Sequence, residues 1–141
     1  MLKVFRIKST DNLFSEARHI RNLVFIQEQG VSLNDEYDQY EDISSHLLIK
    51  YEGQFVGVAR WREIENAIKL ERFAVLSFYR GKGIGKRLVN EIINDVLPYK
   101  KPIYLHAQLA VVGFYSALGF VKVGSIFEEA NIRHYKMEFK P

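Results

Sequence analysis

Leu70-Glu-Arg-Phe-Ala-Val-Leu-Ser-Phe-Tyr-Arg-Gly-Lys-Gly-Ile-Gly-Lys-Arg-Leu-Val89 is the stretch around which the rest of this chain is arranged. Residues 68–76 are apolar and rich in β-forming types, which predicts a strand. From Ile84 onward the apolar residues recur at helical spacing, which predicts a helix. Three glycines at alternate positions and three cations lie between the two: Gly81, Gly83, Gly85, Arg80, Lys82 and Lys86. The stretch therefore predicts a strand, a glycine-rich loop and the first turn of a helix.

This loop has the features of an anion site. The first N–H groups of a helix are unpaired and lie at the positive end of its dipole. Glycines let an anion approach the backbone, and the nearby cations add attraction, so the loop predicts a pyrophosphate site. It is not a Walker loop, because Lys86 is followed by Arg87, and its G-x-G-x-G spacing differs from the dinucleotide fingerprint. The alternative is a glycine-rich helix entry with solvated charges.

Length and composition are those of one ordinary globular domain spanning residues 1–141. Hydrophobic residues make up 48% of the chain and charged residues 26%, and there is no cysteine. Disulfides, thiolate zinc sites and cysteine nucleophiles are thereby excluded. The first residues alternate like a strand, and no apolar run has membrane-spanning length. We therefore expect a cytoplasmic protein with no membrane partner.

The charges are segregated along the chain, although the net charge is only +3. Residues 22–49 hold six acids and no Lys or Arg, whereas residues 80–101 hold six basic residues against two acids. A basic patch suits a phosphorylated cofactor or a nucleic acid, and an acidic stretch suits a cationic substrate. Solvated faces are the alternative explanation for both runs.

The remaining patterns predict alternating hairpins and crossovers. Glu52-Gly53 and Glu65-Asn66 indicate tight turns between strands. Residues 31–43 predict an irregular loop or a short helix. We expect strands at 3–8, 45–51, 54–62, 68–76, 103–107, 120–124 and 132–139, and helices from Asp11 or Asn12 to Gly30, from Ile84 to Pro98, and at 110–118. This order predicts a mixed α/β fold.

Two motifs carry a resemblance to a known family. Arg80-Gly-Lys-Gly-Ile-Gly85 resembles the R-x-x-G-x-G/A loop of the GNAT acyltransferases. Gln108-Leu-Ala-Val-Val-Gly-Phe-Tyr-Ser-Ala-Leu-Gly-Phe120 is similar to the family's N-x-x-A-x-x-F/L-Y-x-x-x-G-F, with Gln108 in place of Asn and Val111 in place of Ala. Further positions resemble the small bacterial ElaA/YjcF-like branch: 24–30, Asp38, Asp42, His46, 70–72 and 129–134. The resemblance covers nearly the whole chain and implies the GNAT fold, a mostly antiparallel splayed sheet of about six to seven strands with helices on both faces.

The resemblance also implies an activity and the residues that perform it. An acetyl-CoA-dependent N-acetyltransferase would move an acetyl group to a primary amine of a small molecule or peptide, by direct transfer in a ternary complex. The backbone of Phe73, Ala74 and Val75 would align the pantetheine, with the Val75 N–H facing the thioester oxygen. Gln108 would help to hold the pantetheine arm, and Tyr115 would protonate the departing thiolate. The pyrophosphate would bind Arg80, Gly81, Lys82, Gly83, Ile84, Gly85 and Lys86.

The base and the acceptor-binding residues are less closely defined by the sequence. Glu71 or Glu28 could accept the proton of the amine through water, and His46 and His106 are further candidates. Surface ion pairs are the alternative for each carboxylate, and a hydrogen-bonded structural role is the alternative for His106. Arg72 interrupts an apolar strand and needs an acidic partner, which could be a carboxylated substrate or an ion pair with the acidic segment. The expected acceptor-binding residues are Glu28, Asp38, His46 and Arg72.

Two other functions remain open at this point. A catalytically silent coenzyme A sensor would keep the loop but lose the acid and the base. A nucleic-acid-binding module would use the basic residues, but these gather at one glycine loop and no RNP-type aromatic string occurs. We therefore expect no nucleic-acid partner, and the four scattered histidines predict no metal site. The chain could be a monomer or a homodimer.

Overall fold

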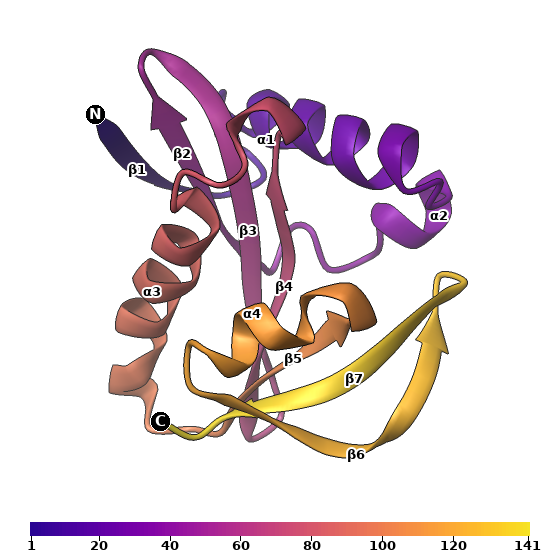
Figure 1. The fold of residues 1–141 in the computed structure, drawn as a ribbon. Coiled ribbons are helices and arrows are strands. Elements are labelled where there is room, and N and C mark those ends of the chain that lie inside the picture. Colours follow the sequence, from indigo (N-terminus) through magenta and orange to yellow (C-terminus); the bar gives the residue numbers. More distant parts are fainter.

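The computed structural model describes all residues from Met1 to Pro141. A seven-stranded sheet in the order β1-β2-β3-β4-β5-β7-β6 forms the centre of the molecule (Figure 1). Its strands are β1 (Leu2–Ile7), β2 (Ser45–Tyr51), β3 (Gln54–Ile64), β4 (Ala67–Val75), β5 (Ile103–Gln108), β6 (Phe120–Glu129) and β7 (Ile132–Phe139). Every neighbouring pair is antiparallel except β4 and β5. The predicted fold class is confirmed.

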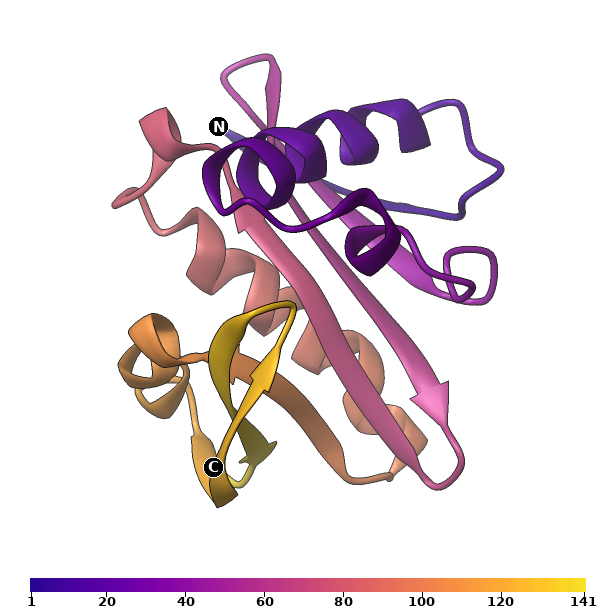
Figure 2. The ribbon, with the colours of Figure 1, turned by 90° about the vertical axis from the view of Figure 1, so that its right-hand side faces the viewer.

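Helices cover both faces of this sheet. They are α1 (Phe14–Arg21), which continues as a π-helical segment over Asn22–Glu28, α2 (Leu33–Glu36), α3 (Ile84–Val96) and α4 (Val112–Ser116). Helices α1 and α2 lie on one side of the long strands β3 and β4, and α3 lies on the other (Figures 1 and 2). No helix combines the length and the apolar character needed to cross a membrane.

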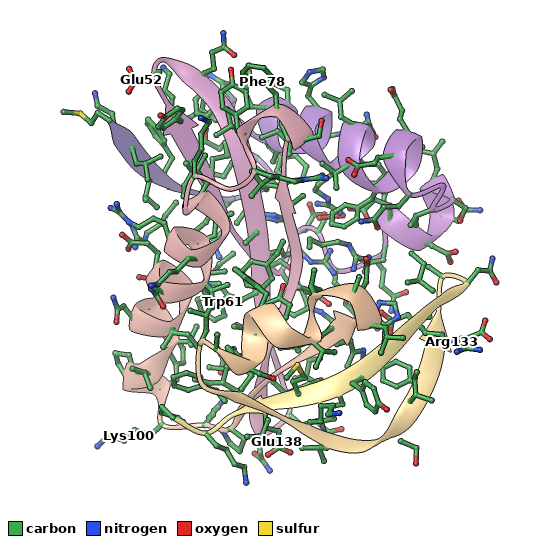
Figure 3. The ribbon with its side chains drawn as sticks, in the orientation of Figure 1. Glu52, Trp61, Phe78, Lys100, Arg133 and Glu138 are labelled. Atoms are coloured by element: carbon green, nitrogen blue, oxygen red, sulfur yellow. The ribbon has the colours of Figure 1, made fainter.

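The two faces of the sheet bury separate cores. Helix α3 turns six apolar side chains inward, all of them buried, as its helical spacing predicted. Trp61 lies within this core, whereas Lys100 is at the periphery (Figure 3). A Cβ on Gly57 of β3 would lie 3.1 Å from Ile84 and 3.2 Å from Leu88, so the glycine lets α3 approach closely. The second core joins α1 and the π-helical segment to the opposite face.

Turn residues set the two hairpins that the sequence predicted. Glu52 and Gly53 both have positive φ angles, +49° and +82°, as a two-residue hairpin turn requires. Glu65 has a φ of +51° at the turn between β3 and β4. One predicted end was wrong: β6 continues through Gly124 to Glu129. Its pairing with β7 shifts register between Val123 and Phe127, so a glycine that resembles a strand end marks an irregularity within the strand.

Strands β4 and β5 stay together for only part of their length. Their parallel pairing covers Ile68 with Ile103, Lys69 with Tyr104, and Leu70 with Leu105, and then stops. Beyond these pairs β4 bends away (Figure 1). The bend coincides with a bulge at Arg72, whose φ is +59° and which has no partner in the shifted β3–β4 register. A bulge bends its strand and re-aims the side chains beside it.

A buried ion network ties the α1 face together. The guanidinium groups of Arg21 and Arg60 are completely buried. Arg21 donates to Glu36 at 2.6 Å and to Glu41 at 2.6 Å. Arg60 donates to both oxygens of Asp38 at 2.9 Å and also binds Glu71. The network thus fixes the segment after α2 against β3 and β4.

We predict that Arg60→Met lowers the free energy of unfolding by about 3–5 kcal/mol, because it leaves two carboxylates without their buried partner. Arg6 is a matched control, since it also binds two carboxylates, Glu91 and Asp95, but its side chain is 48% exposed. Arg6→Gln should cost less than about 1 kcal/mol. Urea denaturation measures both variants. Equal losses in the two variants would show that the buried network does not hold the fold.

Candidate active site

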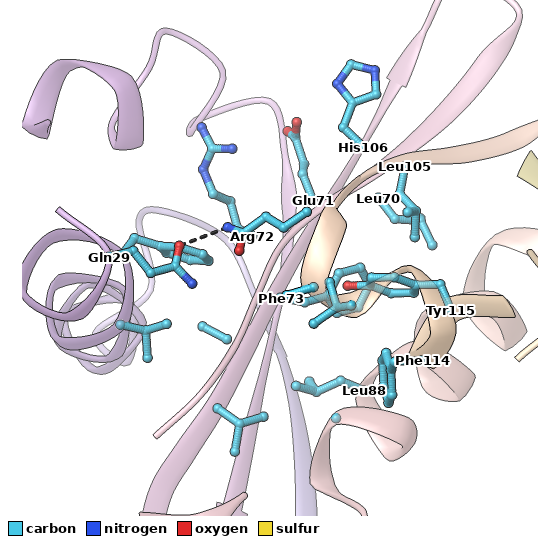
Figure 4. A pocket seen from close by; sticks show the side chains of 18 of the residues that line it. Gln29, Leu70, Glu71, Arg72, Phe73, Leu88, Leu105, His106, Phe114 and Tyr115 are labelled. Atoms are coloured by element: carbon cyan, nitrogen blue, oxygen red, sulfur yellow. Dashed lines mark hydrogen bonds between the residues drawn. The ribbon is translucent and has the colours of Figure 1, made fainter. Parts of the chain in front are cut away.

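A cavity of about 840 Å³ opens where β4 and β5 separate (Figure 4). One end is formed by the glycine-rich loop and the start of α3, and the other by polar residues of β3, β4, β5 and β7. The wall includes most of the predicted site residues: Glu71, Arg72, Phe73, Ala74, Val75, Arg80, Gly81, Gly83, Ile84, Gly85, Lys86, Gln108, Tyr115 and Asp38. Lys82, Glu28 and His46 do not line it.

The glycine-rich loop leaves space beside its backbone. Gly81 and Gly83 have φ angles of +79° and +82°, and a Cβ on either would meet nothing within 4 Å. Gly83 immediately precedes α3, and no side chain caps this helix N-terminus. An anion could therefore reach the first N–H groups of α3 without obstruction. Arg80 currently donates to Glu28 at 2.7 and 2.8 Å and to the Val75 carbonyl at 2.9 Å.

The backbone of β4 is free along one edge of the cavity. Residues 74 and 75 pair with Val58 and Gly57 of β3, but β5 no longer faces them. An unpaired strand edge presents N–H and C=O groups to whatever extended group lies beside it. Across the cavity, the amide of Gln108 donates to the Gln29 side chain at 2.8 Å (Figure 4). Gln29 was not predicted from the sequence, and it fixes the orientation of Gln108.

Tyr115 projects from α4 into the cavity (Figure 4). Its ring contacts Phe73, Phe114 and Phe120, with centroids 5.9, 5.1 and 5.8 Å away. Its hydroxyl makes no hydrogen bond within the protein and is not sealed from solvent. Burial raises the pKa of the Tyr115 phenol. The hydroxyl is therefore protonated at neutral pH and is free to donate to a ligand.

The two predicted carboxylate bases are both engaged in ion pairs. Glu71 binds Arg60, Arg62 and Lys69, and although burial acts in the opposite direction, these cations lower its pKa. Glu28 is outside the cavity wall, and its hydrogen bonds to Arg80 lower its pKa. A carboxylate with a lowered pKa is a weak proton acceptor.

The acidic segment has a different role from the one its charge suggested. Glu36, Asp38 and Glu41 form ion pairs with buried arginines, and these ion pairs neutralise their negative charge. Arg72 pairs with Glu36 and Asp38, at 3.4 and 3.2 Å, which confirms that its partners lie in this segment. The ion-pair alternative therefore explains most of these acids without a cationic substrate.

His46 is a core residue rather than part of the cavity wall. Its side chain is completely buried beside Phe14, and Nε2 lies 3.0 Å from the Glu41 carbonyl oxygen. The candidate role of His46 in acceptor binding is not compatible with this position. No group of three or more His, Cys, Asp or Glu side chains is arranged to hold a metal ion.

A histidine that the sequence did not single out does line the cavity. Nδ1 of His134 lies 2.7 Å from the Ile132 carbonyl oxygen, which can only accept, so Nδ1 carries the proton of the neutral ring. Nε2 then holds a lone pair, has no partner in the protein and is not sealed from solvent. Phe127 stacks on the ring at 5.8 Å and 20°. The pairing of β7 with β5 places this residue opposite Gln108. The resemblance over residues 129–134 included His134 but gave it no role.

His106 also lines the cavity but is held differently. Its Nδ1 lies 2.9 Å from a carboxylate oxygen of Glu129, which agrees with the predicted hydrogen-bonded role. The side chain points away from Tyr115 (Figure 4). Through this hydrogen bond His106 lowers the pKa of Glu129 to about 2. Both residues belong to the polar part of the cavity wall.

Comparisons with known proteins agree with this arrangement. A family model described as an acetyltransferase (GNAT) domain matches residues 22–141. YyaT of Bacillus subtilis (strain 168) is 37% identical over 92% of this chain and 90% of its own length. The N-acetyltransferase YjcF of the same organism is 31% identical over 93% and 95%. The crystal structure of Escherichia coli ElaA has a TM-score of 0.84 at 25% identity and covers 98% of this chain and 99% of that chain. The predicted resemblance is confirmed.

We predict that Gly83→Asp raises the Kd for acetyl-CoA about tenfold to a hundredfold, because it places a negative charge where the pyrophosphate would bind. Gly124→Asp is the matched control, since Gly124 also has a positive φ, +78°, and open space around its Cα, but lies in β6 outside the cavity wall. Isothermal titration measures both. Unchanged affinity in a folded Gly83→Asp protein would contradict this placement of the pyrophosphate.

Proposed function

Because the chain belongs to the GNAT acetyltransferase family and is therefore an acyltransferase, we propose that it transfers an acetyl group from acetyl-CoA directly to a primary amine. The observation that carries this proposal is one continuous cavity. It joins the open glycine-rich loop, the unpaired edge of β4 and the free hydroxyl of Tyr115. We also propose that residues 1–141 act as a single catalytic domain.

In this proposal the cofactor lies along the cavity from the loop toward the bulge. The pyrophosphate binds the backbone of Gly81, Gly83 and the first turn of α3, where the helix dipole favours an anion. Arg80 exchanges its exposed pairing with Glu28 for the phosphate. The pantetheine extends along residues 73–75 like an added strand, with Gln108 opposite. The Val75 N–H donates to the thioester oxygen and stabilises its developing charge.

The chemistry requires one proton to leave the amine and one to reach the sulfur. The amine nitrogen attacks the thioester carbon, the C–N bond forms, and the C–S bond breaks. Tyr115 gives its proton to the departing thiolate, which is supported by its place in the cavity wall and by a hydroxyl that makes no hydrogen bond within the protein. Glu71 and Glu28 remain predicted bases, but ion pairing weakens both. Nε2 of His134 is the stronger candidate to take the proton of the amine, because the residue lines the cavity and Nε2 has no partner in the protein.

The silent-sensor alternative predicts a different outcome in the same assay. A sensor would bind acetyl-CoA but would not release coenzyme A thiol faster when amines are added. Thiol release over a panel of amines therefore tests the proposed function directly. Amine-dependent release, with the acetylated amine identified by mass spectrometry, supports the transferase. Binding without release across the whole panel contradicts it.

We predict that Tyr115→Phe lowers kcat about a hundredfold to ten-thousandfold while the Kd for acetyl-CoA stays within a factor of about two, because only the proton donor is lost. The ring and its aromatic contacts are retained. Tyr99→Phe, next to Trp61 and outside the cavity wall, is the control and should leave kcat unchanged. A wild-type kcat in Tyr115→Phe would reduce this tyrosine to a packing residue.

We predict that His134→Ala lowers kcat about a hundredfold or more and that added imidazole restores part of it, because the small base can occupy the space left by the ring. The acetyl-CoA affinity should not change. His19→Ala, at an exposed position on α1, should keep the wild-type kcat and show no imidazole effect. If His134→Ala is slow but imidazole has no effect, the ring only positions its neighbours.

A further inference from the structure

We propose that the acceptor amine carries a carboxylate group, which binds between Arg62 and Arg72 at the polar end of the cavity. This inference rests on the proposed function and names the class of substrate for that site. It begins with the register of two strands. Arg62 stands directly opposite Lys69, and Arg60 opposite Glu71, so all four side chains lie on one face of the sheet. Trp61 and Leu70 occupy the other face, in the α3 core.

This end of the cavity is distinct from the pyrophosphate loop. Lys69 and Val75 are six residues apart along β4, which corresponds to about 20 Å of extended chain. The loop begins only after Val75, whereas Arg62 is beside Lys69. Arg72, at the bulge, is between the two ends. An acceptor that extends from the thioester to Arg62 therefore lies on the side of the thioester opposite the cofactor's phosphates.

Arg62 has hydrogen-bond donors that the protein does not use. Its Nε donates to Glu71 at 2.8 Å, and its guanidinium lies 3.8 Å from the centre of the Tyr40 ring. Nη1 and Nη2 have no acceptor in the protein, although only 11% of the side chain is exposed. The stacked ring and the Glu71 contact fix the plane of the guanidinium. A fixed fork of N–H groups matches the two oxygens of a carboxylate.

Arg72 is also anchored by the protein and also keeps an unused hydrogen-bond donor. Its Nε and Nη2 bind the carbonyl oxygens of residues 35 and 36 and the carboxylate of Asp38, at 3.2 to 3.3 Å. Nη1 has no acceptor in the protein, and the side chain is 17% exposed. The protein thus supplies two anchored arginines with free donors in one cavity wall.

The charge balance of the ion network favours one added anion. Five cations, Arg21, Arg60, Arg62, Lys69 and Arg72, are joined through ion pairs to four carboxylates, Glu36, Asp38, Glu41 and Glu71. Five positive and four negative charges leave one positive charge. A single carboxylate on the acceptor would neutralise it.

A polycationic acceptor fits this wall poorly. Asp38 and Glu71 are held by arginines, and Glu129 is held by His106. Asp35 is the lining carboxylate without an ion-pair partner, and it is exposed. A second ammonium group placed deep in the cavity would therefore meet Arg62 and Arg72 rather than a free acid. Repulsion between like charges in a partly buried site disfavours such a ligand.

Turnover of matched amines tests the subsite. The assay compares amines whose carboxylate lies about 10 Å or more from the nitrogen, such as ω-amino acids and peptides, with their amides and with the corresponding amines that lack the carboxyl group, because Arg72 is three residues from Val75 along β4. We expect kcat/KM to be about tenfold to a hundredfold higher for the carboxylates, because their charge-assisted hydrogen bonds are lost in the other two sets. Arg62→Gln should abolish that preference by raising the acceptor KM, with the acetyl-CoA KM unchanged. Arg87→Gln, on the exposed face of α3, is the control and should preserve it. Equal kcat/KM values across the three sets would overturn the subsite and leave acetyl transfer intact.

Product binding tests the same subsite without turnover. N-acetyl ω-amino acids and their amides have no free amine and differ only in the charged group. Isothermal titration of the protein with coenzyme A present should show the acids binding at least about tenfold more tightly, and Arg62→Gln should remove the difference. Equal binding of acid and amide would overturn the carboxylate subsite, whether or not the turnover assay shows activity. Absence of thiol release with all amines would instead contradict the proposed function.

Discussion

The separation of β4 from β5 is the constraint on which the rest of this structure depends. Three pairs of residues, ending at Leu70 and Leu105, hold the two halves of the sheet together, and beyond them each strand follows its own half. The bulge at Arg72 turns β4 away while the ion network and the α1 core keep it attached to β3. The cavity, the free strand edge and the approach to the glycine-rich loop all follow from this geometry.

The buried ion network lets one wall of that cavity remain polar. Burying Arg60 costs desolvation free energy, which its contacts with Asp38 and Glu71 offset. Because these acids are already paired, the neighbouring arginines Arg62 and Arg72 retain N–H groups that have no acceptor in the protein. The opposite wall, around Tyr115, is aromatic and supplies a phenol with no internal partner. Donor and acceptor would thus meet between a charged wall and an apolar one.

Local patterns predicted the fold well because they act over short distances. Hairpin turns such as Glu52-Gly53, the apolar stripe of α3 and the glycine-rich loop each have their own sequence signal. The polar end of the cavity was not predictable in the same way. His134 joins it only through the β5–β7 register, and Arg62 only through its place opposite Lys69. The acidic segment suggested a cationic substrate for a related reason. A run of acids in the sequence does not show that arginines distant in sequence form ion pairs with them. The strand over residues 120–124 was predicted too short, because a glycine inside a strand resembles a glycine at the end of one.

Amide hydrogen exchange with and without acetyl-CoA tests most directly whether the gap between β4 and β5 receives the cofactor. Binding in this gap should slow exchange within segments 73–76 and 81–86, where those N–H groups of β4 that face the gap and the N-terminal N–H groups of α3 gain a partner. Residues 121–124 of β6 lie outside the cavity wall and should exchange at an unchanged rate. Protection confined to other parts of the chain, with residues 73–76 and 81–86 unaffected at saturating acetyl-CoA, would contradict the assignment of this cavity as the acetyl-transfer site.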